Sequence, residues 1–326
     1  MAAHEKGLKK KIGSFLFSYN SLVILLLLLV IGSLFVNRFD RSLSTVWVDA
    51  GVYGFVAMGL GLVMVAGYID LSVGFQLGAA SVVTVLVLNA TGSLLVACLC
   101  ALAVGALMGC INGVAIIKLG INPLIATIAT CYIFKGFVYY FTKDGAVYPH
   151  SEVKDVLKYS IAKNQLFDSK WLSLPIVLFV AALILVFLVM RFTRFGINLY
   201  ISGDNAQAGQ LAGLNINRSA FLAYVLCGIC CAVAGIFFAS TAGGAIYTQG
   251  EGREVFAISA CVIGGIKMAG GKGTMVNLLL GVLIMRIIST TMNLLVVPSQ
   301  IMDTVSGALL ILVLIIDRLT SVKKSR

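Results

Sequence analysis

The sequence predicts an all-α fold: a polytopic transmembrane helical bundle that forms a single permease-like domain over residues 1–326. Of the 326 residues, 60% are hydrophobic and only 11% are charged, whereas a soluble domain carries about 25% charged residues. Spanning a bilayer takes roughly 20 mostly apolar residues per helix, and the chain consists largely of such runs. These Leu, Val, Ile and Ala runs lack the alternating pattern of a membrane β-barrel, which is the other way to pair every backbone group in lipid.

Hydropathy and loop charge together predict about ten spans. They lie near residues 17–36, 47–67, 74–90, 93–117, 122–141, 172–190, 219–241, 255–268, 275–297 and 302–317. The segment 255–268 is short, because fourteen residues give roughly 21 Å of helix against a hydrocarbon core of about 30 Å. The segment 74–90 is also only marginally long enough to cross the hydrocarbon core.

Charge predicts how the bundle is oriented. Basic residues of membrane proteins collect in cytoplasmic segments, and both the tail 1–14 and the C-terminal end are basic. We therefore expect both termini in the cytoplasm, which requires an even number of spans. The same count makes 191–218 cytoplasmic and 142–171 extracytoplasmic. We expect no cleavable signal peptide, because the first apolar run lacks a convincing small-residue cleavage site.

Several function classes are disfavoured. Cytoplasmic loops explain much of the net charge of +11, so we expect no nucleic-acid partner. Gly271-Lys272-Gly273 lacks the earlier glycine and the following Ser or Thr of a phosphate-binding loop, so ATP would have to bind to another subunit. The two histidines lie in the tail and the outer loop, which leaves no catalytic set. The eight cysteines lie in apolar runs without a nearby histidine, so we expect free thiols and no metal site.

One carboxylate stands alone in a long apolar stretch. Asp70, in "VAGYIDLSVG" (65–74), is the only charged residue between Asp49 and Lys118. It precedes the backbone N–H groups of Ser72 and Val73, at a helix start that favours negative charge. We favour this capping role for Asp70 over a proton or substrate site.

Three other polar side chains fall inside predicted spans and are candidates to line a pathway: Gln76, Asn112 and Arg286. Hydrogen bonds between helices are the alternative for the two amides. A charge at the bilayer centre costs about 2.5–3.5 kcal/mol even on insertion scales, so Arg286 should face a cavity or a partner. Asp303, Glu251 and Glu254 are possible partners.

The longest polar interval assigned to the cytoplasm is 191–218. Within it, Gly203-Asp204-Asn205 is a helix start signal. A short helix of small and polar residues is expected over 206–212, and Gly213 is a natural stop. Such a helix suits a cleft in a partner protein, although an ordinary solvated loop has the same composition.

Two stretches share one pattern: 65–83 and 262–283 each read as an apolar helix, a glycine-rich break and a second apolar helix. Interrupted segments in corresponding positions of two halves point to a transport site. Glycine is also common in membrane helices simply because it lets them pack closely.

Four segments resemble the membrane permease subunits of the ribose/galactose-type (monosaccharide) ABC importer family. They are "AGYIDLSVG" (66–74), "GCINGVAIIKLGINPLIATIATCYIFKG" (109–136), "RFGINLYISGDNAQAGQLAGLNI" (194–216) and "YTQGEGREVFAISACVIGGIKMAGGKGT" (247–274). The resemblance runs from about residue 45 to residue 320. The first of these segments resembles a specific family signature, which covers Asp70, Ser72 and Gly74.

The resemblance implies an ATP-driven importer of a monosaccharide or sugar-like solute in the bacterial inner membrane. Two permease subunits, identical or different, would form the pathway. ABC ATPase subunits carrying ATP and Mg would dock on the cytoplasmic side, and a periplasmic or lipid-tethered binding protein would deliver the solute. This chain itself would be no enzyme and would hold no cofactor.

The resemblance also places ATPase coupling on seven residues: Gly203, Asp204, Asn205, Ala206, Ala208, Gly209 and Gly213. The coupling segment departs from the family pattern, because Asn-Ala-Gln-Ala-Gly-Gln lacks the usual acidic and basic positions. Arg286 replaces a residue that is usually small or apolar. These departures point to an unusual substrate or to one half of a heterodimer.

Two other functions are compatible with the sequence. A permease of the same superfamily could carry a nucleoside, a sugar-derived signal molecule or a branched-chain amino acid. An ion-coupled secondary carrier would work without an ATPase, and Asp70 would then carry the proton or cation.

Overall fold

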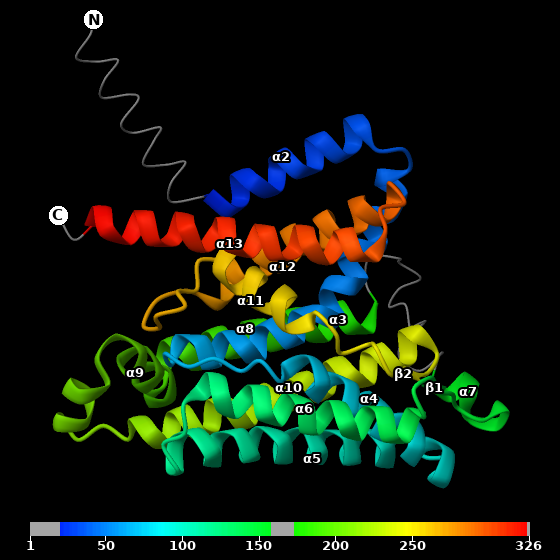
Figure 1. Ribbon diagram of the computed structural model, residues 1–326, viewed down its shortest axis with the longest axis horizontal. Helices are drawn as coiled ribbons and strands as arrows, with labels where there is room; N and C mark the ends of the chain where they lie inside the picture. The colour runs from blue at the N-terminus through cyan, green and yellow to red at the C-terminus, as the bar shows by residue number, and fades with distance from the viewer. Residues whose placement is uncertain (1–19, 158–172, 325–326) are drawn as a thin grey trace, which may run out of the picture.

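The computed structural model describes residues 20–157 and 173–324 (Figure 1). The predicted basic tail 1–14 and the later part of the predicted outer loop lie outside these ranges. Helices dominate the described chain, in agreement with the predicted all-α bundle. Their bounds are α2 (Asn20–Phe35), α3 (Phe39–Val65), α4 (Val73–Thr91), α5 (Leu94–Gly113), α6 (Pro123–Thr142), α7 (Ser151–Leu157), α8 (Leu174–Phe192), α9 (Arg194–Leu211), α10 (Ile216–Ala242), α11 (Arg253–Ile263), α12 (Met275–Leu294) and α13 (Ser299–Lys324).

Every predicted span overlaps one of these helices. Within the described residues, seven helices are long and apolar enough to cross a membrane: α3, α4, α5 with the π-helical turn Val114–Lys118 that continues it, α6, α8, α10 and α12. The helix α11 has only 11 residues, because Gly264 and Gly265 follow Ile263 and end it. The polytopic helical bundle is thus confirmed, and seven of the ten predicted spans correspond to helices that are long and apolar enough to cross a membrane.

The core forms around α10. This helix packs against α3, α4 and α5, and small residues let the backbones approach: Gly105 of α5 lies against Gly228 and Ala232 of α10. Close contact through small residues is the usual way in which helices associate in lipid, where the hydrophobic effect between helices is absent. The helices α2, α11, α12 and α13 lie above α3 in the view of Figure 1, and α5 and α6 lie below it.

The two ends of the bundle differ. At one end lies α9, and α2 begins and α13 ends on that same side (Figure 1). At the other end, β1 (Ala146–Val147) pairs antiparallel with β2 (Ala245–Ile246) beside α7. This small sheet was not predicted, because it joins loops that are about 100 residues apart in the sequence. It ties the predicted outer loop to the segment that precedes α11.

Candidate functional site

The break between α3 and α4 enters the bundle. Residues 66–72 leave α3 at Gly67, whose φ of 85° is in the left-handed region, and reach α4 at Val73. Tyr224 of α10 donates its hydroxyl to the Ile69 carbonyl at 3.0 Å. This bond from the central helix satisfies one carbonyl of a segment that has no helical partner for it.

Asp70 is the centre of a buried polar cluster. Its Oδ1 accepts from the Ser72 N–H at 2.9 Å and the Ser72 hydroxyl at 2.6 Å. Its Oδ2 accepts from the side-chain amides of Gln76 at 2.9 Å and Asn112 at 3.0 Å. All four residues have no exposed surface. Because Asn112 belongs to α5 and Gln76 to α4, the carboxylate ties the break to both helices.

The hydrogen bonds of Asp70 can be compared with the roles predicted from the sequence, which were helix capping for Asp70 and pathway lining for the two amides. The bond from the Ser72 N–H closes a local turn just before α4 and is not a helix cap, because Ser72 is itself the N-cap residue and α4 has no side-chain cap bond. The bond to Asn112 crosses 42 residues of sequence, and spacing alone could not have indicated it. Gln76 and Asn112 both point their amide groups at Asp70, while the oxygens of both amides have no hydrogen-bond partner among the described residues. Their role in lining a pathway stays a prediction.

Gly74 is required by a backbone crossing. A Cβ at this position would lie 2.2 Å from the carbonyl oxygen of Gly250, so any other residue would force the two segments apart. Two segments of the family resemblance, 66–74 and 247–274, therefore meet at this point.

The predicted coupling segment is more helical than expected. We expected a short helix over 206–212, but α9 begins at Arg194 and has 18 residues. It breaks at Asn205, whose φ of −155° is not helical, and the Asn205 Oδ1 accepts from the Ala208 N–H at 2.9 Å. The predicted helix start at Asn205 is thus observed, but it begins the second half of α9 and not a separate helix. The predicted stop is confirmed, since Gly213 has a φ of 76°.

The end of α9 is exposed, but not at every predicted residue. Asp204, Asn205, Ala208 and Gly213 are exposed, and Gly203 and Ala206 are half-buried. Gly209 is buried, and a Cβ there would meet the side chains of Ile216 and Ile201 at 2.3 and 2.6 Å. Its place in the coupling segment is therefore to let the helix pack, rather than to offer a surface.

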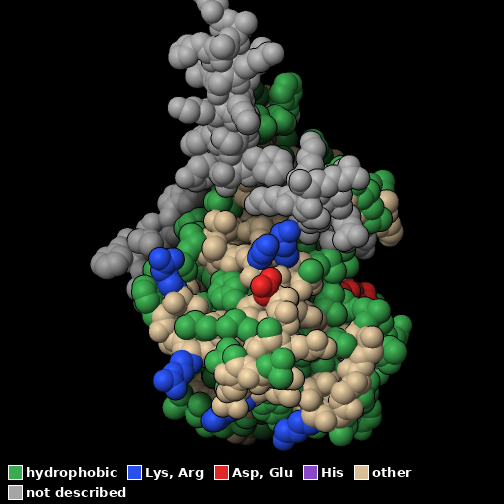
Figure 2. Space-filling view, turned by 90° about the vertical axis from the view of Figure 1, so that its left-hand side faces the viewer, with side chains coloured by type: hydrophobic (Ala, Val, Ile, Leu, Met, Phe, Trp, Pro, Cys, Tyr) green, Lys and Arg blue, Asp and Glu red, His purple; other side chains and the backbone are tan. Residues whose placement is uncertain are grey.

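Leu211 is a candidate contact residue that was not predicted from the sequence. Its side chain is 90% exposed, at the last position of α9 and next to small or polar neighbours. The sequence does contain a sign of it, because Leu211 is the single large apolar residue among the glutamines and alanines of "AQAGQLAG". Figure 2 faces this end of the molecule and shows Lys and Arg side chains around it, with fewer acidic ones.

Backbone contacts lock α9 to the two glycine-rich breaks. We call this contact the glycine junction; it consists of Gly67, Gly203, Gly270 and Gly271. A Cβ on Gly203 would lie 2.1 Å from the Gly271 nitrogen and 2.3 Å from the Val65 oxygen. The Gly271 N–H donates to the Val65 carbonyl at 2.9 Å. The coupling segment and both breaks thus touch through their main chains, with no side chain between them.

Two side chains of α9 reinforce the glycine junction. Ser202 donates its hydroxyl to the Ala66 carbonyl at 2.9 Å, and Tyr200 donates to the Gly273 carbonyl at 2.8 Å. Burial raises the pKa of the Tyr200 phenol above its ordinary value, so the hydroxyl stays a donor at neutral pH. A displacement of α9 would therefore pull on 66–72 and 264–274 together.

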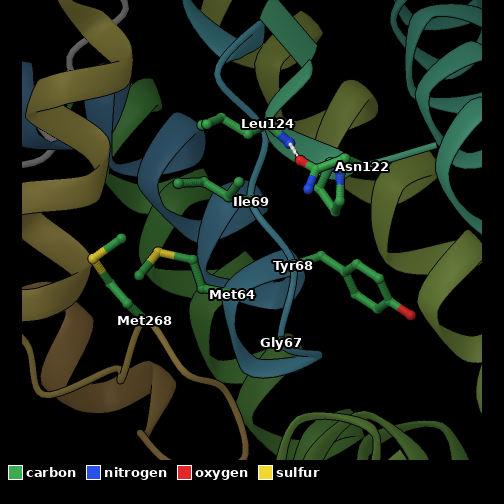
Figure 3. Close-up of a pocket in the computed structure, with 8 residues that line it drawn as sticks. Met64, Gly67, Tyr68, Ile69, Asn122, Leu124 and Met268 are labelled. Carbon is green, nitrogen blue, oxygen red and sulfur yellow. Dashed lines mark hydrogen bonds between the residues drawn. The ribbon is translucent and has the colours of Figure 1, made fainter. Parts of the chain in front are cut away.

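An apolar pocket of about 280 Å³ opens beside the glycine junction (Figure 3). Met64 and Met268 face one another across it, with Ile69 and Leu124 nearby, whereas Tyr68 turns to the opposite side of the break. Asn122 at the edge caps α6 by accepting from the Leu124 N–H at 3.0 Å. Since Gly67 also lines the pocket, movement at the junction would change its shape.

Arg286 pairs with a residue that the sequence did not suggest. Its guanidinium forms an ion pair with Asp49 of α3, 237 residues away. Glu251 instead pairs with Lys135 of α6 at 3.2 Å. The side chain of Asp303 lies outside the described residues.

The described part of the chain offers little to a metal ion. Within residues 20–157 and 173–324, no group of three His, Cys, Asp or Glu side chains is placed to hold one. The eight cysteines are free thiols.

Comparison with known proteins decides the family. The model of the family described as "Branched-chain amino acid transport system / permease component" matches residues 42–314. The chain belongs to this family. It is therefore a transport subunit, and as a permease with seven apolar helices it is a multi-pass membrane protein.

The relatives are permeases too. The permease is 34% identical over 304 residues to the L-arabinose transport system permease protein AraH of Escherichia coli K12, covering 92% of this chain and 90% of that one. It is 33% identical over 281 residues to the autoinducer 2 import system permease protein LsrC of Escherichia coli SMS-3-5, covering 85% and 79%. No solved structure gave a significant match.

Proposed function

We propose that this permease is the transmembrane subunit of an ATP-driven ABC importer for a monosaccharide or sugar-like solute. Relatives at 33–34% identity are named for L-arabinose transport and autoinducer 2 import, which supports a small polyhydroxylated solute. In this proposal a binding protein delivers the solute, a second permease subunit completes the pathway, and separate subunits bind ATP and Mg.

The observation that carries the proposal is the form of α9. Its last residue is the exposed Leu211, while Gly203 in its middle joins both glycine-rich breaks through main-chain contact, just before the helix breaks at Asn205. A segment that is exposed at its tip and fixed to the bundle a few residues earlier suits a lever. Burying a leucine side chain against a partner contributes about 2 kcal/mol, so Leu211 would be a principal contact with the ATPase.

We propose further that α9 and both chain ends face the cytoplasm of a bacterial cell and that all ten predicted spans cross or enter the inner membrane. Exposed basic residues at the α9 end support this orientation: Lys118, Arg191, Arg194, Arg218 and Lys272. The opposite end carries both signs, with Lys143, Lys154, Asp144, Glu152 and Asp155. This difference in charge between the two ends agrees with the basic bias of cytoplasmic segments and supports the proposed orientation.

The mechanism that fits is alternating access. ATP binding would close the ATPase pair and push α9, and the glycine junction would pass this displacement to the helices that follow the breaks, α4 and α12. A ligand shifts such an equilibrium only by its different affinity for the two states. ATP and the loaded binding protein must therefore each prefer one state.

A variant of the exposed leucine tests the docking surface. We expect Leu211→Asp to weaken copurification with the ATPase by about tenfold or more, because it places a charge in an apolar contact. The matched control is Gln210→Glu, which adds the same charge at the neighbouring exposed position. If Leu211→Asp left both ATPase binding and solute uptake unchanged, α9 would not be the docking helix.

A further inference from the structure

A cavity of about 360 Å³ lies between α3, α11, α12 and α13, toward the end opposite α9. Most of the side chains that line it carry polar or charged groups, in contrast to the apolar pocket beside the glycine junction. Those that matter below are Tyr53, Glu251, Arg253, Phe256, Arg286 and Asn293.

Two guanidinium groups contact one aromatic ring in this cavity. The Cζ atoms of Arg253 and Arg286 lie 4.6 and 4.7 Å from the ring centroid of Tyr53. The ring of Phe256 lies 5.6 Å from that of Tyr53. Cations held over a ring are fixed in place without losing all their donors, and the two rings offer apolar faces alongside.

A charged pair forms the edge of the cavity at membrane depth. Glu251 accepts from the Lys135 ammonium at 3.2 Å and from the Tyr139 hydroxyl at 2.9 Å. The side chains of Lys135 and Glu251 are 33% and 45% exposed. Lys135 is seven residues before the end of α6, roughly 11 Å along the helix. Charges at such depth face water or protein rather than lipid, so this edge of the cavity is not a lipid-facing surface.

Three charged side chains line the cavity: Glu251, Arg253 and Arg286. Ion pairs partly neutralise two of them, because Arg286 pairs with Asp49 and Glu251 pairs with Lys135. The three side chains together offer hydroxyl groups both donors and an acceptor.

We propose that this cavity is a transient binding station for a neutral, polyhydroxylated solute on its way through the membrane. Glu251 accepts from solute hydroxyls, Arg253 and Asn293 donate to them, and Tyr53 and Phe256 contact the apolar face of the sugar ring. The inference rests on the proposed function and names the site and the substrate class.

Saturation-transfer difference NMR on the full-length permease in lipid nanodiscs tests the station, because the method detects weak binding. The probes are L-arabinose, D-ribose and D-galactose, with D-galacturonate as the anionic comparison. We expect at least one neutral aldose to give a signal in the wild type. That signal should fall about fivefold or more in Glu251→Gln, which loses a charged acceptor, and in Arg253→Lys, which keeps the charge but loses the fixed donor geometry of the guanidinium. It should persist in Glu152→Gln, an exposed carboxylate of α7.

The proposal is overturned if no neutral aldose gives a signal, if both cavity variants keep the wild-type signal, or if D-galacturonate gives the stronger signal. Size-exclusion chromatography reports folding, and Arg253→Lys, which keeps its charge, decides the result if Glu251→Gln fails to fold. ATP-driven uptake by the wild-type complex is measured in parallel. Uptake without an aldose signal defeats this inference alone, whereas absence of uptake defeats the proposed function.

Discussion

At the scale of single residues, Asp70 shows how a lone carboxylate is tolerated inside an apolar bundle. Four donor groups from three residues surround it: the N–H and hydroxyl of Ser72 and the amides of Gln76 and Asn112. A buried charge is costly unless it is fully hydrogen-bonded. The cluster supplies these hydrogen bonds and fixes the break to α4 and α5, which supports the prediction of a structural role for Asp70.

Removing this carboxylate should destabilise the permease. We expect Asp70→Ala to lower the thermal unfolding midpoint by several degrees in detergent, because each buried donor left unsatisfied costs about 1–3 kcal/mol. The control is Asp155→Ala, at an exposed position of α7, which should unfold as the wild type does. Differential scanning fluorimetry measures both.

The milder change Asp70→Asn separates structure from transport chemistry. If it kept normal stability and assembly but altered only which solute is carried, the structural assignment of Asp70 would have to be reversed. Loss of stability together with uptake agrees with the assignment.

At the scale of elements, the glycine junction connects three segments that the sequence keeps far apart. The break after α3, the base of α9 and the break after α11 meet at Gly67, Gly203, Gly270 and Gly271. Main-chain contacts of this kind leave no flexible side chain to absorb movement. The junction is therefore suited to transmit a displacement of α9 to the bundle.

A single methyl group should disrupt this transmission. We expect Gly203→Ala to reduce ATP-driven uptake by roughly tenfold, which corresponds to a typical coupling free energy between sites, because the added Cβ would lie 2.1 Å from the Gly271 nitrogen. The ATPase should still copurify, since the tip of α9 is unchanged. The same substitution at Gly136 of α6, where a Cβ meets nothing within 4 Å, is the control. Equal uptake by both variants would argue against the junction as the transmitting contact.

The sequence predicted the elements better than their contacts. Long apolar runs located the helices, and Asn205 and Gly213 located the break and the end of α9, because capping and left-handed backbone are local properties. The first half of α9 was missed because it packs against the glycine junction, and no local signal reports that contact. The Arg286–Asp49 ion pair and the hydrogen bond from Asn112 to Asp70 could not be predicted either, because both join residues that are far apart in the sequence.

At the scale of the whole molecule, the permease separates its tasks along its length. The α9 end holds an exposed leucine, basic side chains and the glycine junction. The cavity lined by Glu251, Arg253 and Arg286 lies toward the other end, between α3, α11, α12 and α13. Helices α3, α4 and α10 connect the two ends through a closely packed core. The two sites that we propose, for coupling and for solute contact, thus lie at different depths of one bundle.

Uptake of labelled L-arabinose and related aldoses into proteoliposomes tests the central claim most directly. The vesicles carry the permease with or without its cognate ATPase and binding protein, and an ion gradient is imposed or collapsed independently of ATP. We predict that uptake of at least one sugar requires ATP, the ATPase and the binding protein together, and that it continues when the ion gradient is collapsed. Uptake by the permease alone, stopped by collapse of the gradient, would identify an ion-coupled carrier and contradict the account.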